Sequence, residues 1–168
     1  MTELPHIDEV GTEHAMLSQF LDYYRAVFAR KIEDLDETAG RQRLAPGAMH
    51  LLGMTRHMAD VERWWFRRFF AGETIEPLYD TTDDPDIDWH PEPHETLSET
   101  RQVWFDEVEA CRAIVVASTD LDALAWDRTG HRGDVSLRWI MIHMIEEYAR
   151  HCGHADLIRE SIDGATGD

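Results

Sequence analysis

The sequence predicts an all-α protein that folds as a four-helix bundle. Four long segments carry apolar residues at spacings of three and four, which is the period of a helix with one buried face. No segment shows a convincing apolar–polar alternation of the kind found in half-buried strands, and no internal repeat recurs at a fixed period. At 168 residues the chain fits one domain, residues 1–168, around a single hydrophobic core.

The first two helices are marked by their apolar spacing and by the residues at their ends. We expect the first helix over residues 12–32, with Thr12 as its N-cap and residues 1–11 as a loose arm before it. The second is expected over residues 46–70, opening at a Pro-Gly pair. Its arginines lie opposite its apolar stripe and predict a solvated face: Arg56, Arg63 and Arg67.

The third and fourth helices have equally plain starts. A capping box, Thr96-x-x-Glu99, opens a helix that runs to about residue 118. The last helix is capped by Asp134 or Ser136 and ends before Gly164. Between the second and third helices, residues 73–95 form a long acidic connection with nine acids and four of the six prolines. We expect it to wrap around the bundle, and its length leaves open whether it also covers a site.

The composition excludes several classes of partner. With 34 acidic and 16 basic residues the net charge is −18, which argues against binding to nucleic acid or to an anionic membrane. The N-terminal residues show no basic region followed by an apolar run, and no apolar stretch reaches the roughly 18 residues of a membrane helix, so a cytoplasmic location is expected. Cys111 and Cys152 have no metal-type spacing and are expected to be reduced, buried thiols.

Two polar residues of the fourth helix project into its apolar stripe. On a helical wheel Glu147 and His151 fall within the stripe, whereas His143 and His154 lie at its edge. A carboxylate in a protein core is costly unless it is paired, protonated or bound to a metal. Because residues four apart lie on one helix face, Glu147 and His151 can supply two ligands to a divalent metal.

A third ligand has to come from another helix, because one helix face cannot surround a metal. His57 is the best candidate, since it lies beside the apolar stripe of the second helix. Two histidines and one carboxylate would leave coordination positions open, as catalytic zinc sites do. The residues alone leave two alternatives: His143 competes with His151 as the partner of Glu147, and each histidine can be an ordinary hydrogen-bonded packing residue.

The second and fourth helices also resemble a known family. The segments LLGMTRHMADVERWWFRR and RWIMIHMIEEYARHCGHADLIRESIDG resemble the DinB/YfiT-like superfamily, and the layout is similar over essentially the whole chain. The resemblance implies a bundle of up-down-down-up order, with a metal held by one histidine of the second helix and an i, i+4 pair of the fourth. The second-helix motif, Leu-x-His-hydrophobic-x-x-x-Glu in outline, is matched around His57, with Thr55 in place of the leucine. The usual His-x-x-x-His-x-Gly reads Glu147-x-x-x-His151-x-Gly153, which is similar to the mycothiol-dependent maleylpyruvate isomerase branch.

The resemblance further implies thiol chemistry. Relatives use low-molecular-weight thiols such as mycothiol or bacillithiol, and a metal would bind the thiol, lower its pKa and deliver a thiolate to an electrophile. Zinc is the first expectation, with nickel, manganese or iron as alternatives because such sites do not enforce one ion. His154 replaces a residue that is often glutamine in relatives, and it is expected to orient a ligand or to line the cofactor pocket.

Three functional hypotheses follow. The leading one is a metal-dependent, thiol-using transferase or isomerase of a small-molecule substrate, with His57, Glu147 and His151 as metal ligands. The second is a bundle that binds a metal or a small molecule without turnover. The third is a purely structural dimer in which Glu147 is satisfied by an arginine or by protonation, and a buried Arg150 or Arg56 beside Glu147 would favour it. A homodimer is compatible with all three, because the aromatic-rich second helix has more apolar surface than one bundle face needs.

Overall fold

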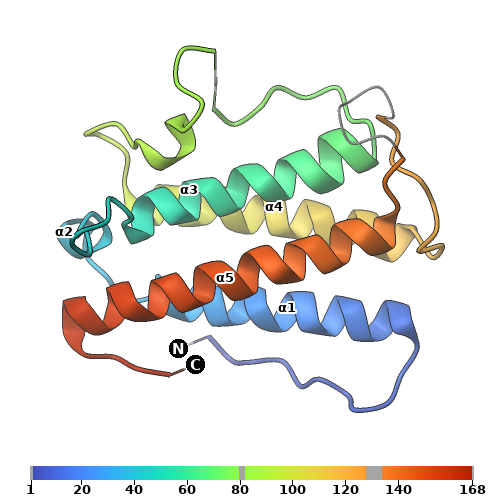
Figure 1. The fold of residues 1–168 in the computed structure, drawn as a ribbon, viewed down its shortest axis with the longest axis horizontal. Coiled ribbons are helices and arrows are strands. Elements are labelled where there is room, and N and C mark those ends of the chain that lie inside the picture. Colours follow the sequence, from blue (N-terminus) through green and yellow to red (C-terminus); the bar gives the residue numbers. More distant parts are fainter. Residues whose placement is uncertain (1, 80–81, 128–133, 168) are drawn as a thin grey trace.

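Four long helices lie side by side in the computed structural model, which describes residues 2–79, 82–127 and 134–167 (Figure 1). They are α1 (Glu13–Lys31), α3 (Leu51–Glu62) with its π-helical continuation η1 (Arg63–Phe70), α4 (Leu97–Ala117) and α5 (Leu137–Asp163). Helices α3 and α4 run in one direction and α1 and α5 in the other, so the order is up-down-down-up. The described residues contain no β-strand, and the predicted all-α bundle is confirmed.

The helix starts agree with the sequence except at α3. Three hydroxyl side chains accept a hydrogen bond from the backbone N–H three residues further on, as predicted for Thr12, Thr96 and Ser136. Helix α3 begins at Leu51 instead of near residue 46, because Nδ1 of His50 accepts a hydrogen bond from the backbone N–H of Gly53 at 2.9 Å. The imidazole thereby satisfies a donor of the first turn, a role usually taken by Ser, Thr, Asp or Asn.

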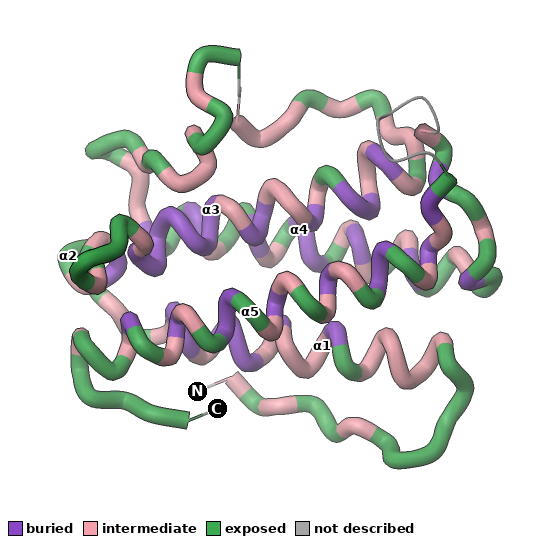
Figure 2. Tube along the Cα trace, in the orientation of Figure 1, coloured by how far each residue is buried: buried purple, intermediate pink, exposed green. Residues whose placement is uncertain are grey.

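The core lies between the four long helices, whose buried segments face inward (Figure 2). Each helix contributes large side chains that are at most 1% exposed, such as Phe28, Met58, Trp104 and Met144. Burial of one such side chain stabilises the fold by about 1.5–3 kcal/mol. Both cysteines are buried and free, as expected. None of the helices in the described part of the chain is long and apolar enough to cross a membrane.

The arginine face of α3 and η1 is covered, so the prediction of a solvated face is wrong. Arg56 is 3% exposed and forms an ion pair with Glu95. Arg63 and Arg67 both donate to the carboxylate of Glu107 on α4, at 2.5–3.1 Å. Acidic residues of α4 and of the crossover neutralise these arginines, which the pattern of a single helix cannot reveal.

A long crossover connects the parallel helices α3 and α4. Because the two helices run in the same direction, the chain has to return along their length, and it does so beside α3 (Figure 1). The described part of this crossover, residues 71–79 and 82–96, contains a single helical turn, η2 (Ile87–Trp89). The crossover therefore wraps around the bundle as expected and brings Trp89 of η2 into contact with His57 of α3 and His151 of α5.

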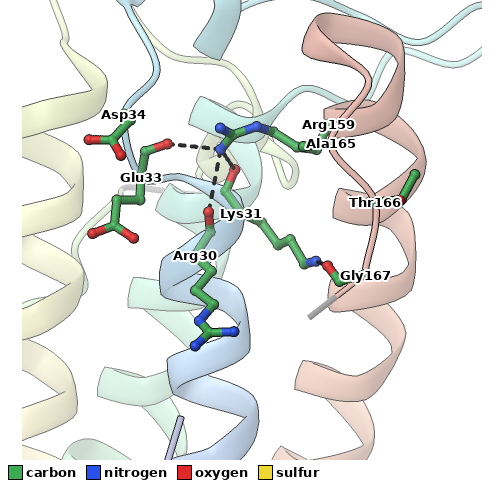
Figure 3. Close-up of a pocket in the computed structure, with 8 residues that line it drawn as sticks. All are labelled: Arg30, Lys31, Glu33, Asp34, Arg159, Ala165, Thr166 and Gly167. Carbon is green, nitrogen blue, oxygen red and sulfur yellow. Dashed lines mark hydrogen bonds between the residues drawn. The ribbon is translucent and has the colours of Figure 1, made fainter. Parts of the chain in front are cut away.

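The end of α1 is fixed by α5 and by the C-terminal segment, around a cavity of about 220 Å³ (Figure 3). Arg159 donates to the backbone carbonyls of Arg30, Lys31 and Glu33 at 2.8–3.3 Å. Lys31 forms an ion pair with Asp156 at 2.6 Å. The guanidinium thus donates to the backbone carbonyls at the end of α1 and just beyond it, which is a structural role.

Candidate metal centre

Three predicted residues meet between α3 and α5. His57 of α3 and the pair Glu147 and His151 of α5 each offer one ligand atom, and these atoms lie within 4.8 Å of one another. Nε2 of His151 lies 3.4 Å from Oε2 of Glu147, and the rings of His57 and His151 are 4.9 Å apart. The i, i+4 spacing places the two α5 residues on one face, and α3 supplies the histidine opposite them.

His151 is held in the neutral form that binds metals. It is 6% exposed, and burial, followed by the neighbouring His57 and His154, lowers its pKa to about 3. A neutral imidazole keeps a lone pair available for a metal. Within the described residues the buried Nδ1 of His151 has no hydrogen-bond partner. A neutral histidine, a second histidine and a carboxylate form a donor set that suits a divalent metal.

His57 is oriented by the crossover. Its Nδ1 lies 2.7 Å from Oδ2 of Asp88, and because a carboxylate can only accept, Nδ1–H is the donor. In the neutral imidazole the lone pair of His57 is then on Nε2. The ring of Trp89 stacks on His57 at 4.7 Å and lies 5.6 Å from the ring of His151. Neither crossover residue is assigned a role from the sequence, although the length of the connection leaves open whether it covers a site.

The carboxylate of Glu147 is shared between two histidines. Oε1 lies 3.8 Å from Nε2 of His143, while Oε2 faces His151. His143, Glu146 and Glu147 form a second group whose ligand atoms lie within 4.8 Å. This group already holds a cation, because Arg150 pairs with Glu146 and lies 3.3 Å from Oε1 of Glu147. In the group with His57 and His151, Arg150 contacts Oε1 of Glu147, whereas Oε2 faces His151, so this group is the better candidate for a metal.

The third hypothesis allows either an arginine or a proton to neutralise Glu147, and a buried arginine beside it would favour this hypothesis. The side chain of Arg150 is 52% exposed, and the buried Arg56 pairs with Glu95 instead. An exposed ion pair of this kind contributes little to stability. The structure therefore offers no buried arginine partner for Glu147 among the residues it describes.

The match to known proteins agrees with this geometry. Residues 16–164 match the family described as mycothiol-S-transferase. The chain belongs to the mycothiol-S-transferase family. A crystal structure of a conserved protein from Enterococcus faecalis shares 15% identity with it at a TM-score of 0.60, over 93% of this chain and 100% of that one, which shows the fold alone. Among curated proteins no match is found. The family confirms the DinB-like resemblance.

His154, predicted to contact a cofactor, lies beside the centre in this mycothiol-S-transferase family member. Its ring is 5.6 Å from the ring of His151 and nearly perpendicular to it, at 62°. The buried Nδ1 of His154 has no hydrogen-bond partner within the described residues. The position is compatible with a pocket-lining role, and that role stays a prediction.

The most deeply buried carboxylate among the described residues, Glu62, is not singled out by the sequence analysis. Glu62 is 0% exposed, whereas the side chain of Glu147 is 13% exposed. Arg25 donates two hydrogen bonds to Glu62 at 2.8 and 2.7 Å, and the Tyr148 hydroxyl donates a third at 2.7 Å. Trp104 in turn donates to the Tyr148 hydroxyl at 2.8 Å. The available indication was the family motif, which places a glutamate five residues after the histidine.

Aromatic side chains extend from the centre along α5. Trp139 stacks on His143 at 4.9 Å and lies 5.3 Å from Trp65. Trp139 is 41% exposed and lines a cavity of about 490 Å³ together with Leu124 and Val135. This surface suits the packing of an apolar or aromatic group of a small molecule.

Proposed function

We propose that this mycothiol-S-transferase family member is a metal-dependent enzyme that transfers a low-molecular-weight thiol of the mycothiol type to an electrophilic small molecule. The observation that supports it most is the convergence of His57, Glu147 and His151 in a chain of this family. Three protein ligands leave room for a further ligand, as in catalytic rather than structural sites.

The proposed metal is divalent, with zinc as the first choice and nickel, manganese or iron as alternatives. When bound, it would lower the pKa of a thiol so that the thiolate is present near neutral pH. The protein's own residues prepare the site for this role. Burial keeps His151 neutral, Asp88 directs the lone pair of His57, and Trp89 covers the two rings on one side.

The thiol is proposed to come from outside the chain. Cys111 and Cys152 are 0% and 4% exposed. Burial raises the pKa of Cys152 to about 12 and that of Cys111 well above its usual value. Both side chains are therefore protonated and shielded near neutral pH, so neither is suited to act as a nucleophile.

The experiment combines metal analysis with thiol consumption. Protein purified without a His tag should contain a divalent metal and should conjugate mycothiol to a haloaromatic electrophile, and a chelator should abolish the reaction. His151→Ala should lose both metal and activity. His6→Ala removes a histidine whose side chain is 86% exposed and should retain both. Metal binding without thiol consumption for haloaromatics, epoxides and maleylpyruvate-like acids would instead support the binding protein without turnover.

A further inference from the structure

We propose that η2, the turn Ile87–Trp89, is a built part of the metal centre and that Asp88 is the positioning residue that fixes His57 for metal binding. The inference rests on the proposed metal site, because it assigns a role toward the ligand His57. Three observations on the α3 face that receives η2 support it: a hydrogen bond, a buried clamp and a close backbone approach.

The hydrogen bond determines which nitrogen of His57 faces the site. A neutral imidazole has two tautomers, and the partner of one nitrogen determines where the proton lies. With Nδ1–H donating to Asp88 at 2.7 Å, the lone pair is on Nε2. Stacking of Trp89 at 4.7 Å, with 28° between the ring planes, further restricts rotation of the His57 ring. A carboxylate behind a histidine ligand also makes that histidine a stronger donor to a metal.

A buried arginine holds the turn against α3. Arg56 is 3% exposed; its Nε donates to the carbonyl of Asp88 at 2.9 Å, and its Nη2 donates to the carbonyl of Ile87 at 2.8 Å. Its remaining nitrogen pairs with Glu95, and its guanidinium lies 3.8 Å from the ring centre of Tyr79. One cation thereby fixes two consecutive carbonyls of η2, which holds the Asp88 side chain in register with His57.

The third observation is the absence of a side chain at Gly53. A Cβ at this position would lie 2.9 Å from the carbonyl oxygen of Trp89 and 2.8 Å from Cε1 of the capping His50, both closer than side-chain carbons approach in proteins. Gly53, Arg56 and His57 are spaced i, i+3 and i+4, so they form one face of α3. On this face Gly53 leaves space for η2, Arg56 holds its carbonyls, and His57 contacts Asp88 and Trp89. A crossover that merely connected two helices would require none of these.

Nuclear magnetic resonance of the metal-free protein tests the hydrogen bond without depending on catalysis. Long-range nitrogen–proton spectra should show His57 protonated on Nδ1 in the wild type. Asp88→Ala should move the proton to Nε2 or produce exchange between the tautomers. Asp86→Ala removes an exposed carboxylate two residues earlier and should leave the spectrum unchanged. A wild-type His57 protonated on Nε2, or a spectrum unaltered by Asp88→Ala, would overturn the proposal.

Zinc affinity then tests the role in metal binding. Asp88→Ala should weaken zinc binding by about 10–100-fold. Asp88→Asn should bind zinc more tightly than Asp88→Ala, because its amide oxygen can still accept the hydrogen bond from His57. The control Asp86→Asn should bind zinc like the wild type. Gly53→Ala should also weaken binding, although it leaves every proposed ligand and Asp88 in place. Unchanged affinity in both Asp88 variants would overturn the assigned role. A wild-type protein that binds no divalent metal would instead refute the proposed function, whatever the tautomer of His57.

Discussion

The substitution Glu62→Gln keeps the shape of the deepest carboxylate and removes its charge. It would leave the guanidinium of Arg25, which is 3% exposed, without its main partner in the core. Removing one member of a buried ion pair costs about 3–5 kcal/mol. Asp22 also accepts from Arg25, at 3.0 Å, and it is partly exposed, so we expect the lower end of this range, about 3 kcal/mol. That is a large share of the total free energy of unfolding of a typical protein, roughly 5–15 kcal/mol.

Urea unfolding followed by far-ultraviolet circular dichroism measures this loss as a lower midpoint at an unchanged slope. The matched control is Glu109→Gln, because the side chain of Glu109 is 68% exposed and its ion pair with Arg112 should contribute less than about 1 kcal/mol. The double variant Arg25→Met/Glu62→Leu should be less destabilised than the sum of its single variants, since it removes both charges. A loss for Glu62→Gln no larger than that of the control would refute this reasoning.

Three further predictions concern stability. Burial, and next the charge of Arg43, lower the pKa of His50 to about 4. As the pH falls, His50 therefore becomes protonated in the unfolded chain while it is still neutral in the folded chain. This contribution is present above about pH 6.5 and is lost toward about pH 4. Urea denaturation at both ends of that range measures the loss of stability on acidification. The loss should be smaller in His50→Asn than in the wild type, by at most about 3 kcal/mol. Equal losses would contradict the assignment. Tyr148→Phe leaves the buried indole N–H of Trp104 without its partner and removes one of the two donors to Oε1 of Glu62, so it should cost about 1–3 kcal/mol in urea unfolding. A neutral result would show that the hydroxyl is dispensable. Gly72→Ala should lower the free energy of unfolding by about 1–2 kcal/mol, because φ is +70° and the new Cβ would lie 2.5 Å from the Trp126 ring. An unchanged free energy of unfolding would show that the turn relaxes freely.

The helices could be predicted because their information is local. Apolar spacing marked the buried faces, and hydroxyl residues such as Thr12 and Thr96 marked the starts. The predictions were wrong where contacts between segments distant in the sequence determine the structure. The cap of α3 is the uncommon imidazole of His50, and the burial of Arg56 depends on a crossover that lies about thirty residues further along the chain.

The candidate metal centre shows the same difference between local and long-range information. Glu147 and His151 are paired by helical spacing alone, and His57 followed from the wheel and from the family motif. The partner of His57 could not be predicted, because Asp88 is one of nine acids in residues 73–95 and only the docking of η2 on α3 selects it. Glu62 was overlooked because a helical wheel gives no information about a partner on another helix, here Arg25 of α1.

The central claim is that His57, Glu147 and His151 together bind a divalent metal. The most direct test is the zinc content and zinc affinity of the untagged protein and of its single alanine variants. The wild type should bind one zinc ion per chain, and each of the three variants should lose most of this affinity, whereas His143→Ala should retain it because its group already contains Arg150. A wild-type chain without affinity for zinc or any other divalent metal, or unaltered binding in His151→Ala, would contradict the claim.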